Sequence, residues 1–135
     1  MGITNFDVVQ AALSGQLAAY PSAERTATAA GDGTGVIADA GMLQFVTVTS
    51  DNAAKIITLP TPTPGTIVIL RNGATGYELR SSAPATVAIN GGAAANAESA
   101  IGASTMVIAV CTSATTWQAI GIAGATLAGV EAAAA

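Results

Sequence analysis

From Met42 onward the chain is divided into short runs of β-branched and other apolar residues, separated by turn-forming glycine, proline and asparagine. The runs recur at intervals of about ten residues, which is typical of all-β proteins. The separating segments, such as PTPTPG and NGATG, have residue types that suit tight turns. We therefore predict a mainly β fold, an antiparallel, tulip- or jelly-roll-like β-sandwich of about seven strands, with an amino-terminal helical or extended arm. The expected strands are residues 43–49, 55–59, 66–71, 77–81, 85–89, 105–111 and 116–122.

The clearest expected hairpin covers residues 66–81. An apolar run there meets Asn72-Gly73, a dipeptide that tolerates the positive φ angles of tight hairpin turns. A second run then returns with Tyr77 and Leu79 on one face. We predict that these two runs pair with each other in one sheet.

Several expected strands are apolar on both faces, as in the runs at 67–70 and 106–110. A strand of this kind is buried on two sides. In a sandwich only one face of each sheet reaches the internal core, so the second face needs other cover. The charges agree, because Glu98 is the only charged residue between Arg80 and Glu131. We expect another subunit to cover the second face.

The amino-terminal segment has a different pattern. Over residues 4–20, apolar residues recur at steps of three or four, which predicts a short amphipathic helix. The stripe consists of Phe6, Val9, Leu13 and Leu17. Such a stripe can dock in a groove on another protein or pack against the chain's own sandwich. We take these four side chains as the candidate contacts to a partner.

The composition divides this chain of 135 residues into four parts around one core. Residues 1–25 form the expected arm, and residues 26–41 a glycine-rich linker or edge segment. Brief strand pairing is expected within residues 21–41. Residues 42–123 form the sandwich, and residues 124–135 an alanine-rich tail. This tail is too short to hold a helix alone, so we expect it to fray or to dock on a neighbour.

Charged residues make up only 9% of the chain, with four Lys or Arg against eight Asp or Glu. Four cations can neutralise few phosphates, and the net charge of −4 repels them, so we expect no nucleic-acid partner. The uncharged run at 99–130 is interrupted by Ser, Thr, Gly and Gln, so we expect no membrane span. The first ten residues have no basic region before an apolar stretch, and we expect no secretion signal.

The residue types of common catalytic and metal sites are scarce. Histidine is absent, which excludes Ser/His/Asp, Cys/His and His-containing zinc sites. Cys111 is the only cysteine, so we expect a buried apolar residue and no intrachain disulfide. The segment GDGTG at 31–35 lacks the remaining residues of a P-loop or an EF-hand, so we expect a turn. We predict no catalytic residue, no cofactor and no metal site.

Two further features have alternative interpretations. Asp51, Glu78 and Glu98 can in principle supply the two carboxylates of a glycosidase, but we expect them in ion pairs or solvated loops. Trp117, the only tryptophan, can stack on a sugar, but we expect an anchor in the core or at a trimer contact.

The β region at 43–122 contains the segments ITLPTPTPG, TIVILRNGATGYELR, ATVAINGG, AESAIGAST and TSATTWQAIG. In these segments it resembles bacteriophage head decoration (cement) proteins, and its residue pattern is also similar to that of trimeric phage tail-fibre modules. The resemblance implies a homotrimer of β-sandwich or β-tulip-like protomers. It also implies a position on the three-fold axes of an icosahedral head, where the trimer clamps adjacent major capsid subunits.

We therefore predict a non-enzymatic virion structural protein, a trimeric decoration protein on the capsid exterior that binds the major capsid protein and stabilises the head. The alternative is a tail-fibre or receptor-binding module that holds a host surface glycan through Trp117 and the loop at 90–100. A third hypothesis is a small carbohydrate-active enzyme that uses Glu78 or Glu98.

Overall fold

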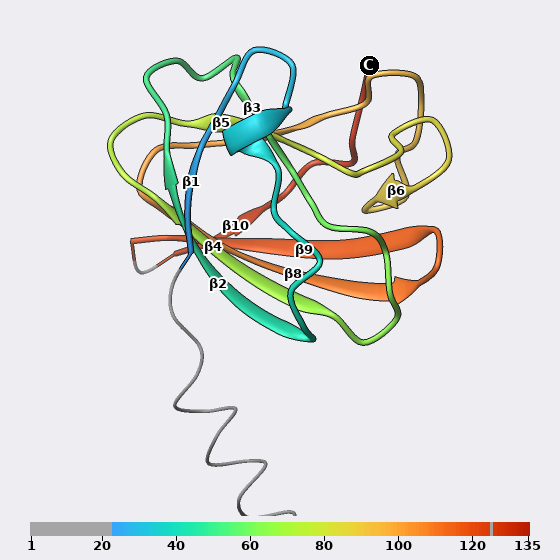
Figure 1. Ribbon diagram of the computed structural model, residues 1–135. Coiled ribbons are helices and arrows are strands. Elements are labelled where there is room, and N and C mark those ends of the chain that lie inside the picture. The colour runs from blue at the N-terminus through green and yellow to red at the C-terminus, as the bar shows by residue number, and fades with distance from the viewer. Residues whose placement is uncertain (1–22, 125) are drawn as a thin grey trace, which may run out of the picture.

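The computed structural model describes residues 23–124 and 126–135 (Figure 1). These residues form ten strands in two sheets and one short 3-10 helix. The elements are β1 (Ala23–Thr26), η1 (Gly33–Gly35), β2 (Leu43–Thr49), β3 (Ile56–Thr58), β4 (Ile67–Asn72), β5 (Tyr77–Arg80), β6 (Ala88–Ile89), β7 (Ser99–Ile101), β8 (Thr105–Ser113), β9 (Thr116–Ala123) and β10 (Thr126–Gly129). Sheet A has the order β1-β2-β4-β8-β9-β10, with β6 beside β9, and sheet B has the order β3-β5-β7. In the described ranges, no helix has the length and apolarity needed to cross a membrane.

A mainly β fold is confirmed. Each of the seven expected runs overlaps a strand, and β2 has the expected bounds. The strand β1 lies in the part of the chain for which we predicted brief strand pairing. Strands β7 and β10 were not predicted, because Ser99–Ile101 and Thr126–Gly129 are short and contain only one β-branched residue each.

The prediction of an antiparallel β-sandwich is wrong, because the sheets are mixed. In sheet A, β1, β2 and β4 run parallel, and in sheet B, β3 and β5 run parallel. From β2 to β5 the chain alternates between the two sheets, so it winds in a coil similar to a β-solenoid (Figure 1). Parallel neighbours need a crossover connection. The crossover from β2 to β4 contains β3 of the opposite sheet, and the crossover from β3 to β5 contains β4. Only the later strands β8, β9 and β10 add to sheet A in antiparallel fashion.

The predicted hairpin at 66–81 is also wrong. Strand β4 pairs with β2 and β8, whereas β5 pairs with β3 and β7 in the other sheet. The buried Asn72 fixes the turn between them: its Nδ2 donates to the carbonyl oxygens of Thr75 and Gly102 at 2.8 and 2.9 Å. Its Oδ1 accepts a hydrogen bond from the Thr105 amide at 3.0 Å. Turn-forming residues alone do not determine which sheet the next strand joins.

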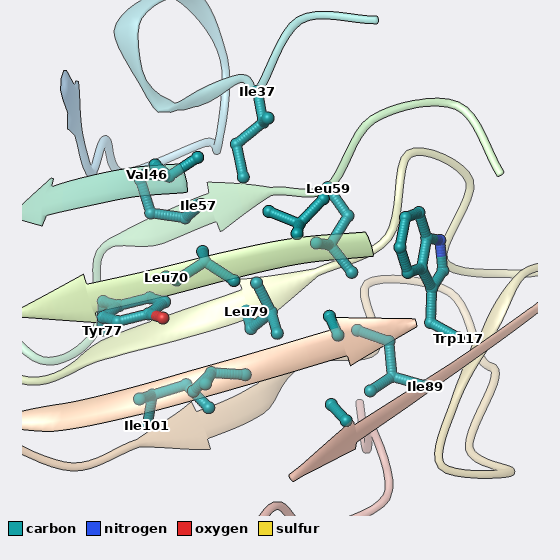
Figure 2. Packing of buried hydrophobic residues seen from close by; sticks show 14 of the residues in the cluster. Ile37, Val46, Ile57, Leu59, Leu70, Tyr77, Leu79, Ile89, Ile101 and Trp117 are labelled. Atoms are coloured by element: carbon teal, nitrogen blue, oxygen red, sulfur yellow. The ribbon is translucent and has the colours of Figure 1, made fainter. Parts of the chain in front are cut away.

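The hydrophobic core lies between the two sheets (Figure 2). Sheet A contributes alternate residues of β2, β4, β8 and β9, and sheet B contributes residues of β3, β5 and β7. The largest fully buried apolar side chains are Trp117, Tyr77, Ile37, Ile57, Leu59, Leu70, Leu79 and Ile89. Full burial of a large apolar side chain contributes about 1.5 to 3 kcal/mol, so this layer is the main source of stability in the protomer.

The alanine-rich tail packs against its own chain. Strand β10 pairs with β9, and the Ala133 amide donates to the Ile89 carbonyl at 3.1 Å. Glu98 and Ala134 exchange two backbone hydrogen bonds of 2.9 Å. Gly92 lies so close to the Ala133 backbone that a Cβ at this position would collide with it. The expectation that the tail frays or docks on a neighbour is therefore wrong.

Candidate functional site

The outer face of sheet A follows from the alternation of side chains along its strands. In β2, Val46 is buried in the core and the next residue toward the start of the strand, Phe45, is exposed. In β4, Val68 is buried and Ile69 points outward, where it is half-buried. Sheet A therefore has large apolar side chains on both sides.

The strand register arranges the outward side chains in cross-strand rows. The central row crosses four adjacent strands, from β2 to β9, and consists entirely of large apolar residues: Phe45, Ile69, Ile108 and Ile120. The row on one side contains Leu43, Ile67 and Val110, and the row on the other side contains Met106, Ile122 and Leu127. Together these side chains form what we call the apolar face.

Four members of the apolar face are open to solvent. The exposed fraction is 39% for Phe45, 37% for Met106, 49% for Ile120 and 71% for Leu127. The other members are half-buried. A contiguous apolar surface on a globular domain marks an interaction site. Strand β8 is the only described strand with a member in all three rows, so the apolar face is centred close to β8.

Polar residues bound the apolar face at one corner. The row that ends in Leu127 begins at β1 and β2 with Glu24 and Thr47, followed by Arg71 on β4. Within residues 23–124 and 126–135, the Arg71 side chain makes no hydrogen bond or ion pair, whereas Lys55 bonds to Asp51 at 2.8 Å. Arg71 lies near the end of β4, beside a groove lined by residues 47–50 and 71–75. Its long side chain can therefore reach water past the end of the sheet.

The outer face of sheet B is covered by the same chain. Ile56 is only 4% exposed, because Gly31 lies against its side chain. The Thr58 hydroxyl donates to the Gly31 carbonyl at 2.6 Å, and Arg80 Nη1 donates to the Ala30 carbonyl at 3.3 Å. These contacts come from the GDGTG segment and the residue before it, and the turn expected there contains η1. One loop thus covers this face at β3, whereas Glu78 on β5 is half-buried and Ala100 on β7 is exposed.

The three acids considered for a glycosidase lie in two places. Asp51 pairs with Lys55, and the hydrogen bond from Lys55 lowers the pKa of that carboxyl. Glu78 lies on sheet B, where burial and, to a lesser extent, the nearby Glu98 raise its pKa. Glu98 itself forms an ion pair with Arg80. Asp51 and Glu98 are therefore in ion pairs, as expected from the sequence.

The structure places the other candidate residues as follows. The four residues of the amino-terminal stripe lie outside the described residues: Phe6, Val9, Leu13 and Leu17. Trp117 is 0% exposed on the inner face of β9, so its indole ring offers no surface on which a sugar can stack. Figure 2 shows Trp117 in the core with Leu59 and Ile89.

Cys111 pairs across the strands with Trp117 and is a buried free thiol, as expected. Burial raises the pKa of this thiol, and its Sγ donates to the Ser113 carbonyl at 3.0 Å. In the part of the chain that the structure describes, no three His, Cys, Asp or Glu residues are grouped so that they could hold a metal ion.

The apolar face was predicted only in part. The runs at 67–70 and 106–110 indicated a second face in need of cover, and Ile69 and Ile108 now lie side by side on it. Phe45 and Leu127 belong to the same face only because β2 and β10 pair as they do. Their membership depends on the strand order, which no pattern in the sequence reveals.

Comparison with known proteins gives no identification: no protein-family model, no curated protein and no solved structure matches the chain. The function must therefore be inferred from the chain's own residues.

Proposed function

We propose that the chain is a non-enzymatic structural protein of a phage virion, a trimeric decoration protein on the outer capsid surface. It would stabilise the head by bridging subunits of the major capsid protein. The apolar face of sheet A is the observation that supports this proposal, since such a surface serves lasting association between chains. The resemblance of residues 43–122 to phage decoration proteins supplies the kind of assembly.

The energetic argument starts from the side chains that the protomer leaves in water. Ile120 and Leu127 are 49% and 71% exposed, although full burial of such a side chain contributes about 1.5 to 3 kcal/mol. Association removes this surface from water and so stabilises the assembled state. The same chain carries few charges that would oppose close contact between copies, at 9% of its residues.

The stabilising mechanism requires no turnover. A protein that binds only the assembled capsid lowers the free energy of that state by RT ln(1 + [L]/Kd) for each site. A trimer presents three copies of its capsid-binding segment, so several weak contacts act together. In this division of roles the apolar face joins the copies, and the stripe formed by Phe6, Val9, Leu13 and Leu17 contacts the capsid.

Deletion of residues 1–20 tests the capsid-binding role. Strand β1 begins at Ala23, so the deletion leaves both sheets whole. We expect the trimer to persist and the occupancy of purified heads, measured by quantitative mass spectrometry of the particles, to be lost. Leu13→Asp should reduce occupancy strongly, whereas the matched change Gln10→Asp, beside the stripe, should have little effect. Full occupancy of heads by the truncated protein would exclude this assignment.

The copy number separates a decoration protein from a tail module. A decoration protein copurifies with heads in an amount comparable to that of the major capsid protein, whereas a tail module is present in few copies. The receptor-binding alternative also required Trp117 as a glycan platform, and this ring is 0% exposed. We therefore propose the decoration role alone.

A further inference from the structure

We infer that three copies of the chain pack with the outer faces of sheet A turned toward a common three-fold axis, so that the apolar faces form a second hydrophobic core in the trimer. This inference rests on the proposed function and names the surface through which the copies associate. The partner at this surface is therefore a second and a third copy of the same chain.

The dimensions of sheet A fit this arrangement. Its strands from β1 to β10 lie in a row of six, and with a spacing of about 4.8 Å the sheet is about 24 Å wide. Three such sheets arranged as a triangular prism leave about 7 Å between the midline of each sheet and the axis. Sheets in face-to-face contact lie about 10 Å apart, so the side chains of one sheet fill about 5 Å. Long apolar side chains therefore fill the prism without a wide channel.

The residues at the midline have the required character. The midline of the six strands falls between β4 and β8, where Ile69 and Ile108 are cross-strand partners. Phe45 and Ile120 flank them in the same row, one strand further from the midline on each side. Ile69 and Ile108 thus lie where three copies would approach the axis most closely.

The position of the charge agrees with the same arrangement. An unpaired guanidinium inside an apolar interface costs several kcal/mol. Arg71 lies in the row nearest the end of β4 and beside the groove at 47–50 and 71–75, which places it at the mouth of the prism. There its side chain stays in water. Glu24 and Thr47 lie in the same row toward the β1 edge, and at the opposite end of the face the uncharged Gln118 pairs with Val110.

The apolar face has the size of a patch that marks an interaction site. Its rows are separated by two residues along each strand, so three rows cover about 20 Å of strand length. Each of its ten side chains covers about 33 Å² of the sheet, so the flat area is about 330 Å², within the range of about 300 to 600 Å² for the largest apolar patch of a monomer. Apolar residues dominate the centre of this face, as they do in the interfaces of obligate assemblies.

Native mass spectrometry of the full chain tests the inference through matched substitutions. We expect the wild-type protein to have three times the protomer mass, and Ile108→Glu and Ile120→Glu to be monomers. Val36→Glu is the control, since Val36 is 39% exposed, similar to the 49% of Ile120, and lies outside sheet A. This variant should remain a trimer. Ile120→Glu keeps the test valid if Ile108→Glu does not fold, because Ile120 is half exposed in the protomer.

Oxidation of methionine by peroxide gives a second readout. Met106 lies on the apolar face and is 37% exposed in the protomer, whereas Met42 lies outside it and is 58% exposed. We expect Met106 to react much more slowly than Met42 in the wild-type trimer and at a similar rate in the Ile120→Glu monomer.

Three results would overturn the inference. A wild-type monomer with protected Met106 would assign the face to residues 1–22 of the same chain, and a monomer with reactive Met106 would assign it to a different protein. A trimer that survives both Ile108→Glu and Ile120→Glu would place the contact elsewhere. That last result would leave the decoration role intact, because head occupancy tests it separately.

Discussion

The outer faces of the two β-sheets differ in how far the chain itself covers their apolar side chains. On sheet B, the apolar Ile56 is covered by Gly31, and hydrogen bonds from Thr58 and Arg80 hold the covering loop. On sheet A, Ile120 remains 49% exposed, compared with 4% for Ile56. The chain itself thus covers an apolar side chain on the outer face of sheet B, whereas the apolar side chains on the outer face of sheet A remain available to other chains.

This difference separates the stability of the folded protomer from the stability of the assembly. Removal of the cover on sheet B should weaken the protomer at any concentration. Substitutions of exposed residues on the outer face of sheet A should weaken the assembly and leave the stability of the isolated protomer nearly unchanged. The loss of the trimer in Ile108→Glu is the largest expected effect of this kind.

Truncation of one apolar side chain on each face compares the two directly. Ile56→Ala should lower the free energy of unfolding by about 2 to 4 kcal/mol, because a buried side chain leaves a cavity under the loop. Leu127→Ala, at a site that is 71% exposed, should change it by less than about 0.5 kcal/mol. Urea unfolding in an Ile120→Glu background measures both variants as monomers. Equal losses would contradict the distinction between the faces.

The covering loop can be displaced by a single methyl group. Gly31 has φ +69°, and a Cβ there would lie 2.6 Å from Ile56 Cγ2 and from Thr58 Oγ1. Gly31→Ala should therefore cost about 2 to 4 kcal/mol, from backbone strain and overpacking together. Gly33→Ala is the control, since Gly33 has φ +52° but open space around it, and only the strain of about 1 to 2 kcal/mol applies. Thermal unfolding should separate the two variants.

The smallest expected effect concerns the pH dependence of stability on sheet B. Burial, and secondarily Glu98, raise the pKa of Glu78 in the folded protein above its unfolded value. The folded state therefore binds this proton more tightly, and the stabilisation it gives at low pH is lost as pH rises through the folded pKa. Glu78→Gln should remove that loss, with a gain at neutral pH of less than about 1 kcal/mol because solvent screens the group.

Urea unfolding at a series of pH values checks this prediction. The exposed Glu131 provides the control Glu131→Gln, which should follow the wild-type curve. If the free energy of unfolding of Glu78→Gln changes with pH in parallel with that of the wild type, Glu78 does not contribute to the pH dependence of stability.

The sequence predicted the strands well and their pairing poorly. Runs such as 43–49 and 67–70 are rich in β-branched residues, and these local preferences hold in any sheet. The partner of each strand depends on contacts far along the chain. The Asn72-Gly73 turn illustrates this, because it suits a hairpin but is held instead by bonds from Asn72 to Gly102 and Thr105, about thirty residues away.

The association surface was predictable in kind and not in outline. Apolar residues at successive positions of β4, such as Val68 and Ile69, indicate that both faces of a strand are covered. The sequence does not show that a glycine-rich loop covers Ile56 on one sheet, while Ile120 stays exposed on the other. That outcome depends on which loop crosses which sheet.

The winding of β2 to β5 between the two sheets also has a consequence for synthesis. Strand β2 becomes an internal strand only after β3 has crossed to the opposite sheet and β4 has returned. The coil is complete at Arg80, before β8, β9 and β10 have left the ribosome. The nascent chain therefore exposes one long open edge on β4 until β8 arrives, and the emerging polypeptide is most vulnerable to mispairing during that interval.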